Sequence, residues 1–257
     1  MLRGVGLASY FDSIMPLPFA HRGGAKVAPN LGIENSIAAF QHAYELGYRY
    51  FETDVRATAD GVAVACHDER LDRLSGDPRA IAEIDSHELE SLLLGSAEQI
   101  VAFDALLEAF PDVYFNVDIK SDDAVAPTIA VLREREAVEK VCLASFDHTR
   151  LAHVRKLGGG LLTSASTREA ATMVIGRDVP EAPLVFQVPV RHKGVKVVTR
   201  RFIDKAHSHG KHVHVWTIDD PGEMHRLLDL GVDGIITDRT DHLKDVLIER
   251  GQWKEPT

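Results

Sequence analysis

Short apolar runs alternate along the chain with longer stretches of helical period. The runs typical of β-strands cover residues 17–21, 49–54, 113–119, 140–145, 161–164, 184–188, 212–217 and 234–238. Helical patterns lie between them, at 103–110, 123–137, 147–157, 167–175, 199–209 and 220–230. This alternation predicts an α/β fold, a parallel (β/α)8 TIM barrel. The main alternative is an open doubly wound sheet, whose nucleotide-binding form has little support because no G-x-G-x-x-G motif follows the first strand.

The clearest helical pattern comes directly after the first strand. It starts near Asn35, a residue that suits the N-cap position, and it ends at Gly47. Its apolar residues recur at spacings of four, three and four positions, and they are Ile33, Ile37, Phe40 and Tyr44. One apolar stripe of this kind predicts an amphipathic helix packed against the sheet.

One further strand-like run, at 62–66, lies outside the set of eight. Only the short stretch "ATADG" separates it from the second strand, which is too little chain for a parallel crossover. We therefore expect a β-hairpin extension after strand two. A turn centred between Ala59 and Asp60 would set His67 opposite Glu52, at the mouth of the barrel.

Length and composition fit one domain that covers residues 1–257, with 45% hydrophobic and 26% charged residues. The formal net charge of -10 disfavours a nucleic-acid partner. No apolar run approaches the roughly 18 residues of a membrane helix, and we expect no signal peptide and no stable membrane insertion. Cys66 and Cys142 lie in apolar strand-like runs, which predicts reduced, buried thiols in a cytoplasmic protein.

Polar residues end two of the apolar strands. Because side chains alternate along a strand, Glu52 and Asp54 share one face of the second strand. In the same way, Asn116, Asp118 and Lys120 share one face of the third strand. Both sets fall at the carboxyl ends of their strands, where the active site of a (β/α)8 barrel lies.

Three carboxylates brought together in this way would repel one another, and burying them unpaired is costly. A divalent cation removes that conflict, and oxygen-only ligands favour Mg²⁺ or Ca²⁺. The alternative is that the carboxylates make salt bridges with Lys120 or Arg56.

Candidate proton-transfer groups lie at the same end of the predicted barrel. His21 ends the first strand and His67 ends the hairpin, so the two could act as general acid and general base. Arg22 supplies a positive fork suited to phosphate. Gly23 and Gly24 either let the backbone approach a ligand closely or simply form a turn.

The ordered set of these motifs is similar to that of the glycerophosphodiester phosphodiesterase family, over about residues 17–247. The motifs are "AHRGG" at 20–24, "ENS" at 34–36, "FETDVRATADGVAVACHD" at 51–68, "FNVDIK" at 115–120, "HVWTID" at 214–219 and "GVDGIITD" at 231–238. The resemblance implies a barrel like that of phosphatidylinositol phospholipase C. It also implies metal-dependent hydrolysis of glycerophosphodiesters to glycerol 3-phosphate and an alcohol.

The resemblance also implies roles for particular residues. By position, His21 and His67 are the catalytic histidines, and the metal ligands are Glu52, Asp54 and Asp118. The family usually has Glu at the third metal position, so Asp118 departs from it by one methylene.

Four more residues match the family's motifs. Arg22 and Lys120 would bind the phosphate, and Trp216 would form an aromatic wall beside the substrate. Glu34 would support the loop that follows the first strand. Between His67 and the third strand, about 45 residues are expected to be mostly helical, without the large inserted domain of some relatives.

Other interpretations remain open at this point. A lysophospholipase D-like enzyme would perform the same chemistry on a lipid, and an exposed apolar collar at the mouth would favour it. A barrel without catalysis could serve as a binding module. The histidines at 207, 209, 212 and 214 resemble a metal cluster, although solvated or packing histidines are favoured. The basic loop 191–196 could contact phosphate or lipid, although a solvated loop is favoured.

Overall fold

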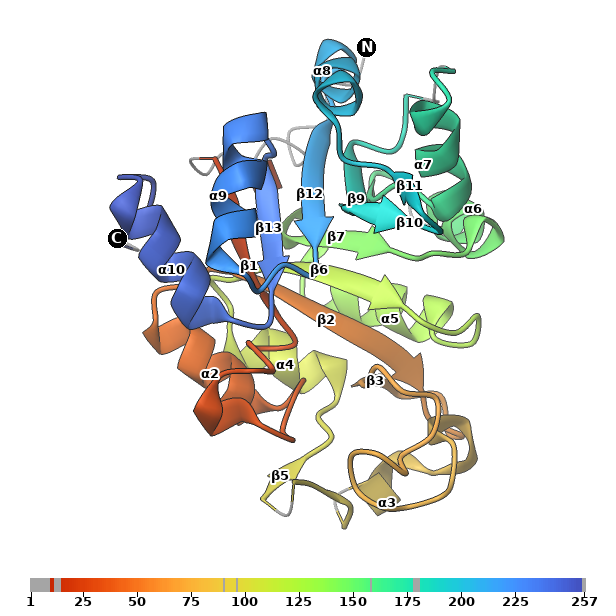
Figure 1. Cartoon of the computed structure of the whole chain (residues 1–257). Coiled ribbons are helices and arrows are strands. Elements are labelled where there is room, and N and C mark those ends of the chain that lie inside the picture. Colours follow the sequence, from red (N-terminus) through yellow and green to blue (C-terminus); the bar gives the residue numbers. More distant parts are fainter. Residues whose placement is uncertain are drawn as a thin grey trace.

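The structure is a computed structural model that describes residues 10–11, 15–89, 91–95, 97–157, 159–177 and 181–255. In these residues, parallel strands surround a central axis and helices lie outside them (Figure 1). The barrel strands are β1 (Leu17–His21), β2 (Tyr50–Ala57), β6 (Tyr114–Ile119), β7 (Val141–Ala144), β8 (Leu162–Thr163), β9 (Val185–Pro189), β12 (His212–Trp216) and β13 (Gly234–Thr237).

The barrel closes through one short contact. Its strand order is β8-β7-β6-β2-β1-β13-β12-β9, and every neighbouring pair on this path is parallel. At the two ends of the path, Ser164 and Val185 form a parallel bridge, and the Ala165 amide donates to the Val185 carbonyl at 2.8 Å. The predicted (β/α)8 barrel is therefore confirmed, and an open sheet is excluded because its edge strands meet.

Helices follow the strands as the sequence pattern predicts. They are α2 (Ile37–Glu45), α4 (Phe103–Ala109), α5 (Val125–Glu134), α6 (His148–Leu157), α7 (Thr167–Val174), α8 (Arg200–Ser208), α9 (Pro221–Leu230) and α10 (Thr240–Glu249). The last of these covers a stretch for which no helix is predicted above. Short 3-10 turns are η1 (Ala28–Asn30) and η3 (Val138–Lys140).

The N-cap predicted for the first of these helices is wrong by one residue. Ser36 caps α2, because its hydroxyl accepts the Ala39 amide at 3.1 Å. Asn35 instead adopts a left-handed conformation with φ 63°, and its side chain turns toward β2. There it accepts from the Thr53 hydroxyl at 2.9 Å. Asn35 therefore belongs to the polar end of the barrel and not to the helix.

The hairpin after strand two is confirmed, with a register one residue away from the predicted one. Strand β3 (Ala63–Ala65) runs antiparallel to β2, and Val55 pairs with Ala65. The turn therefore centres on Asp60, whose carboxylate accepts from the Thr58 hydroxyl at 2.5 Å. Gly61, with φ 82°, completes the turn in a conformation that favours glycine.

The stretch after the hairpin is mostly turns, so the mostly helical expectation is wrong. It contains η2 (Ile81–Glu83), α3 (Ser86–Leu89), β4 (Leu93–Leu94) and β5 (Glu98–Gln99). Its apolar side chains join Val64 of β3 in a separate small core, which consists of Val64, Cys66, Leu71, Leu74, Ile81, Ile84, Leu89, Leu94 and Ile100. In Figure 1 the segment with α3 and β5 lies below β2 and β3.

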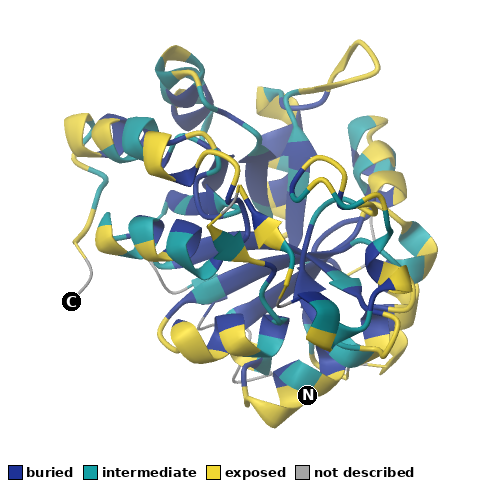
Figure 2. Ribbon diagram, turned by 90° about the horizontal axis from the view of Figure 1, so that it is seen from below, coloured by how far each residue is buried: buried dark blue, intermediate teal, exposed yellow. Residues whose placement is uncertain are grey.

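Strand side chains alternate between two apolar layers. On β2, Phe51 points outward and stacks on Phe40 of α2, with ring centroids 4.9 Å apart. The neighbouring Tyr50 points into the barrel and stacks on Tyr114 of β6 at 5.0 Å. Figure 2 shows the result, with buried strands at the centre and helices that are buried on one side and exposed on the other. Apolar side chains, with the buried His214 among them, fill the amino-terminal part of the barrel interior, and the buried carboxylates lie toward the carboxyl ends of the strands.

Two further expectations concern processing and membranes. The stretch considered for a signal peptide falls largely on residues 1–9 and 12–14, which lie outside the described residues. Among the described helices, none has the length and apolar content needed to cross a bilayer. Cys66 and Cys142 are free and buried, as their apolar surroundings predict.

Candidate active site

A pocket of about 540 Å³ opens at the carboxyl ends of the barrel strands. Of the polar and aromatic residues singled out at the strand ends, those that line it are His21, Arg22, Glu52, Asp54, His67, Asn116, Asp118, Lys120 and Trp216. Glu34 lies behind them, against Arg22, with its Oε1 2.9 Å from Nη1 of the arginine. The barrel thus brings together side chains that are far apart in the sequence.

Two carboxylates face each other across neighbouring strands. Asp54 on β2 pairs in register with Asp118 on β6, and Glu52 lies one step further into the barrel. Burial and the charge of Asp54 raise the pKa of Glu52 to about 7. Burial also raises the pKa of Asp118. Burial therefore disfavours the charged form of both Glu52 and Asp118.

Two cationic side chains of the protein, Lys120 and Arg22, hold Asp54. Lys120 Nζ lies 2.7 Å from Asp54 Oδ1 and 2.6 Å from Asp118 Oδ2. Arg22 Nε lies 2.9 Å from Asp54 Oδ2. Although burial opposes ionisation, Lys120 and Arg22 together lower the pKa of Asp54. The salt-bridge alternative is therefore realised at Lys120, but not at Arg56, which donates to the His67 carbonyl at 2.9 Å.

The same carboxylates fit a divalent cation. Oε2 of Glu52 and Oδ1 of Asp118 are buried and have no hydrogen-bond partner among the described residues. Unpaired buried carboxylate oxygens are costly, and a divalent cation bound by them would remove the cost. The described residues include no group of three acidic, histidine or cysteine side chains already arranged as ligands. Two of the three carboxylates, Asp54 and Asp118, instead contact Lys120.

His21 is fixed by an aspartate that the sequence analysis does not single out. Its Nδ1 lies 2.5 Å from Asp238 Oδ1, and its Nε2 lies 3.6 Å from Glu52 Oε2. Burial lowers the pKa of His21, but Glu52 and the hydrogen bond to Asp238 outweigh burial, so the pKa is raised. Asp238 directly follows β13, which neighbours β1. Its place at a strand end is the signal that finds it, as it is for Asp54.

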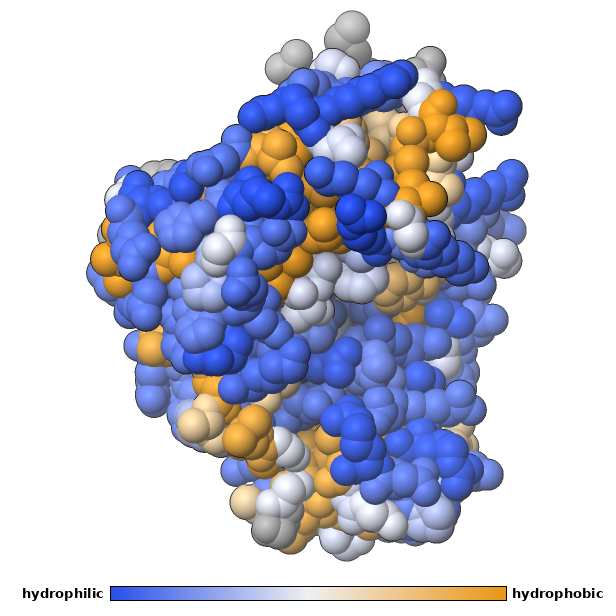
Figure 3. Space-filling model, viewed as in Figure 1, coloured by the Kyte–Doolittle hydropathy of each residue, from blue (hydrophilic) through white to orange (hydrophobic). Residues whose placement is uncertain are grey.

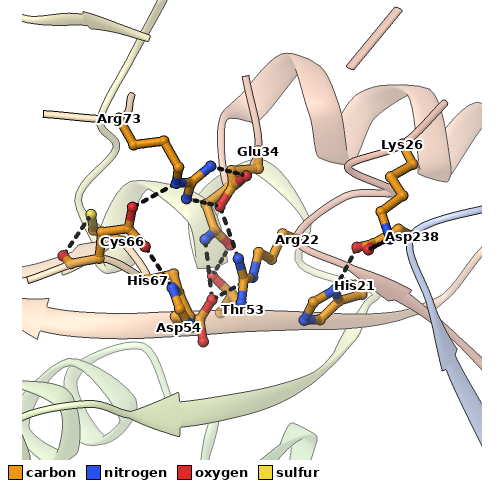
Figure 4. A network of polar contacts seen from close by, with 12 residues as sticks. His21, Arg22, Lys26, Glu34, Thr53, Asp54, Cys66, His67, Arg73 and Asp238 are labelled. Carbon is orange, nitrogen blue, oxygen red and sulfur yellow. Dashed lines mark hydrogen bonds and ion pairs between the residues drawn. The ribbon is translucent and has the colours of Figure 1, made fainter. Parts of the chain in front are cut away.

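His67 is fixed in the same way by its neighbour in sequence. Its Nδ1 lies 2.7 Å from Asp68 Oδ1. A carboxylate only accepts, so this contact places the hydrogen of the neutral ring on Nδ1 and leaves Nε2 free. The Cys66 amide, which donates to the Asp54 carbonyl at 2.9 Å, attaches this chain segment to β2. Figure 4 shows His67 close to Asp54, while His21 and Asp238 lie further along the same site.

The two glycines after Arg22 serve packing against the protein itself. Gly23 and Gly24 have φ values of 86° and 88°, which favour glycine. A Cβ on Gly23 would lie 2.6 Å from the Ala39 carbonyl carbon, and one on Gly24 would lie 2.8 Å from the Thr240 hydroxyl. They form a turn that lets α2 and α10 approach the first strand, which is the simpler of the two expectations.

One wall of the pocket is apolar. Trp216 packs edge to face on Phe146, with ring centroids 5.4 Å apart. Further apolar residues of the lining are Ala170, Ala171, Val174, Ile175, Val188, Pro189, Val195 and Val197. Figure 3 shows apolar side chains gathered at the upper right, over the region that holds α7 in Figure 1. The pocket thus has a charged floor and one apolar wall.

The basic stretch 191–196 folds into a small hairpin at the rim. Strand β10 (Arg191–His192) pairs with β11 (Val195–Lys196), and both are exposed. Three of its residues line the pocket: His192, Lys193 and Val195. A loop expected to be solvated therefore also borders the site.

The histidines between 207 and 214 pack or pair individually. His214 is fully buried in the barrel interior, where burial lowers its pKa to about 3, and His212 stacks on Phe11 with centroids 4.0 Å apart. His207 pairs with Asp233 at 2.8 Å. These contacts agree with packing histidines, and no metal-ligand group is found there among the described residues.

The barrel fold hosts many activities, so the class of this protein comes from comparison with known families. The glycerophosphoryl diester phosphodiesterase family matches residues 21–242. The chain belongs to this family and is an enzyme of it.

Individual relatives agree with this assignment. A Mycobacterium tuberculosis protein named probable glycerophosphodiester phosphodiesterase 2 is 39% identical over 92% of each chain. The human protein named lysophospholipase D GDPD1 is 26% identical, over 89% of this chain and 85% of its own. Among solved structures, an Oleispira antarctica phosphodiesterase in complex with the product sn-glycerol-3-phosphate has a TM-score of 0.77 at 19% identity. It covers 91% of this chain and 97% of its own.

Proposed function

We propose that this enzyme hydrolyses glycerophosphodiesters to glycerol 3-phosphate and an alcohol, with a divalent cation and with His21 and His67 as the proton-transfer pair. One observation carries the proposal. Each histidine is held through Nδ1 by an aspartate, and both line one pocket with a carboxylate floor. Two orientated histidines beside a cation site suit phosphodiester hydrolysis better than they suit a binding module.

The cationic side chains would bind the substrate's anionic phosphate. Arg22 and Lys120 line the pocket directly, and the fork of Arg22 suits phosphoryl oxygens. A divalent cation held by Glu52, Asp54 and Asp118 would supply further positive charge to those oxygens as the phosphorus becomes five-coordinate. Local charge of this kind attracts an anion even though the whole chain carries a net charge of -10.

The two histidines would move the protons. One accepts the proton of the attacking oxygen at Nε2 while the new phosphorus–oxygen bond forms. The other donates a proton from Nε2 to the leaving alcohol oxygen while the old bond breaks. Asp238 and Asp68 hold the opposite ring nitrogens, so both rings present Nε2 for this exchange.

The relatives support this reaction. The names of two of them denote phosphodiester hydrolysis, and the Oleispira antarctica structure holds sn-glycerol-3-phosphate as its product. The buried, free thiols of Cys66 and Cys142 support a reducing compartment, and we place the enzyme in the cytoplasm.

A substrate panel tests the proposal. Glycerophosphocholine, glycerophosphoethanolamine and glycerophosphoinositol are offered to metal-stripped enzyme, with and without Mg²⁺ or Ca²⁺, and release of glycerol 3-phosphate is measured. Activity is expected only with added metal. His21→Ala and His67→Ala are each expected to lower kcat at least about a hundredfold, because acid–base catalysis is lost.

A matched control is His207→Ala, which removes a histidine paired with Asp233 away from the pocket and should leave kcat unchanged. Full activity of the metal-stripped enzyme would refute the proposed requirement for a divalent cation. Near-normal turnover in either site variant would remove that histidine from the mechanism.

The apolar wall favours a second candidate substrate class, the lysophospholipids. Among the described residues, seven large apolar side chains are exposed, and three of them line this pocket. They are Phe146, Ile175 and Val195, with exposed fractions of 55%, 67% and 55%. A single acyl chain would cover this wall while its phosphodiester lies on the charged floor.

The second candidate is tested by comparing lysophosphatidylcholine with glycerophosphocholine. Ile175→Ser and Val195→Ser are expected to lower kcat/KM for the lysolipid about tenfold, from lost apolar burial, and to leave the water-soluble diester unaffected. Ile248→Ser, at a residue on α10 with a similar exposed fraction of 52% and outside the pocket, is the control. Equal effects on both substrates would exclude an acyl-chain site on this wall.

A further inference from the structure

Arg73 does not line the pocket, but it connects the residues that hold His67 with those that hold Arg22. It lies in a turn of the stretch that follows the hairpin, and its side chain is 50% exposed. Its Nη1 and Nη2 donate to Glu34 Oε2 and Oε1 at 2.9 and 2.8 Å, and its Nε donates to Asp68 Oδ2 at 2.7 Å. One guanidinium thus holds two carboxylates that come from separate parts of the chain (Figure 4).

Each of these carboxylates holds a residue that does line the pocket. Asp68 uses its other oxygen, Oδ1, to accept from His67 Nδ1 at 2.7 Å. Glu34 Oε1 also accepts from Arg22 Nη1 at 2.9 Å, and Arg22 in turn lies against Asp54. The chain of contacts therefore runs without a break from His67 to Arg22, and Arg73 is its middle member.

The turn that carries Arg73 is itself fixed by packing. Leu71 and Leu74, on either side of it, are buried in the small core defined above. Val64 and Cys66 of the hairpin segment belong to the same core. The segment that carries His67 and the turn that carries Arg73 are therefore packed together, which limits how far the guanidinium can move.

We propose that Arg73 is a positioning residue for the phosphodiesterase reaction, which orients His67 through Asp68 and the phosphate-binding Arg22 through Glu34. This inference rests on the roles proposed above for His67 and Arg22. The planar fork of arginine suits it to three carboxylate oxygens at once, and a lysine cannot reproduce that geometry. Without it, Asp68 loses the partner that directs its second oxygen, and Glu34 retains only Arg22.

The test compares Arg73→Ala with the wild-type enzyme on glycerophosphocholine. Loss of a residue that orients a functional side chain typically costs about 10–100-fold, and we expect that loss in kcat/KM, with kcat lowered through His67 and KM raised through Arg22. Arg73→Lys should recover only part of it. In the His67→Ala background, Arg73→Ala should lower kcat no further, because residues that act as a unit are not additive.

Arg79→Ala is the matched control. Arg79 lies in the same stretch of chain, and its guanidinium likewise bridges two carboxylates, those of Asp77 and Glu88, away from the pocket. Thermal unfolding of both variants separates lost folding from lost positioning. Arg79→Ala should leave kcat and KM unchanged at any comparable loss of stability.

A measurement without substrate separates this inference from the proposed reaction. Side-chain nitrogen NMR of His67 should show the Nδ1-protonated tautomer in the wild type and a mixture of tautomers in Arg73→Ala. If the wild type hydrolyses no diester, the proposed function fails while the NMR result still decides the role of Arg73. An unchanged tautomer, wild-type kcat/KM in Arg73→Ala, or additive losses in the double variant would overturn the inference.

Discussion

Single residues at strand ends decide what this barrel can do. Glu52, Asp54 and Asp118 are buried carboxylates on two neighbouring strands, and their alternation with apolar residues is visible in the sequence. Their partners are less visible. That Lys120 and Arg22 converge on Asp54 depends on how the strands are set side by side.

Asp238 shows the limit of sequence patterns at this scale. It lies 217 positions from His21 along the chain and contacts it because β1 and β13 are neighbours in the closed barrel. Strand-end placement marks it as a candidate, but only the pairing of first and last strands assigns it to that histidine.

Asp238→Asn is expected to lower kcat by at least about tenfold. An amide in place of the carboxylate can donate to His21 Nδ1, which favours the wrong tautomer of the ring. The measurement is kcat at saturating glycerophosphocholine, together with the unfolding midpoint. Lys26→Met, which removes a cation 3.0 Å from Asp238 that does not contact His21, should change kcat little. A stable Asp238→Asn variant with wild-type kcat would show that Asp238 does not orient the ring.

At the scale of single elements, the sequence predicts well which segments form helices and strands. It predicts less well where a helix begins or in which register two strands pair. The hairpin after β2 is predicted from a loop too short for a crossover, and the structure confirms it. Its register depends on the Thr58–Asp60 contact and on Gly61, details that the apolar pattern does not contain. The same limit applies to α2, where Ser36 and not Asn35 forms the cap.

Helix α7 forms part of the apolar wall, and a buried charge fixes its start. Glu169 Oε2 accepts the Ser166 amide at 2.8 Å, while Glu169 Oε1 accepts from Arg155 at 2.7 Å. Glu169→Gln keeps the shape but removes the charge opposite Arg155. The free energy of unfolding at pH 7 should fall by roughly 2 kcal/mol, between the values for exposed and buried ion pairs.

The effect of Glu169→Gln should depend on pH. Burial opposes ionisation of Glu169, but Arg155 and the Ser166 amide outweigh it and lower the pKa in the folded state. The stabilisation is therefore complete above the unfolded pKa of about 4.3 and is lost as the pH falls through the lower folded value. Urea unfolding of both proteins at pH 7 and in acid measures this. The matched change Glu223→Gln, in a more exposed pair with Arg226, should have a small effect at both pH values. A difference that persists undiminished in acid would contradict the charge argument.

At the scale of the whole molecule, the barrel separates stability from chemistry along its axis. The amino-terminal part of the barrel interior is filled mainly by apolar and aromatic side chains, where Tyr10 packs edge to face on Tyr50 and Tyr114. The carboxyl ends of the strands carry the charged pocket. Substitutions at the two ends should therefore have different consequences.

Gly234→Ala tests this division. Gly234 starts β13, and a Cβ there would lie 2.9 Å from His214 Cδ2 and 3.1 Å from the Leu17 carbonyl oxygen. Overpacking of this kind should lower the free energy of unfolding by about 1–3 kcal/mol. The value of kcat/KM per folded molecule should stay within about twofold of wild type, because the active end of the barrel is not touched. Gly159→Ala, where a Cβ meets nothing within 4 Å, is the stability control. A loss of kcat/KM as large as the loss of stability would show that the two ends are coupled.

The sequence by itself determined the barrel, its strand-end carboxylates and histidines, and the family to which these motifs belong. The helical period and the strand alternation of apolar residues are local properties of the sequence, so they can be read without knowing which segments come together. Tertiary structure alone decided that Asp238 holds His21, that Arg73 joins Glu34 to Asp68, and that α7 and the β10–β11 hairpin give the pocket an apolar wall. The contact of His21 with Asp238 and the apolar wall depend on neighbouring barrel strands, and the contacts of Arg73 depend on the packing of its turn in the small core.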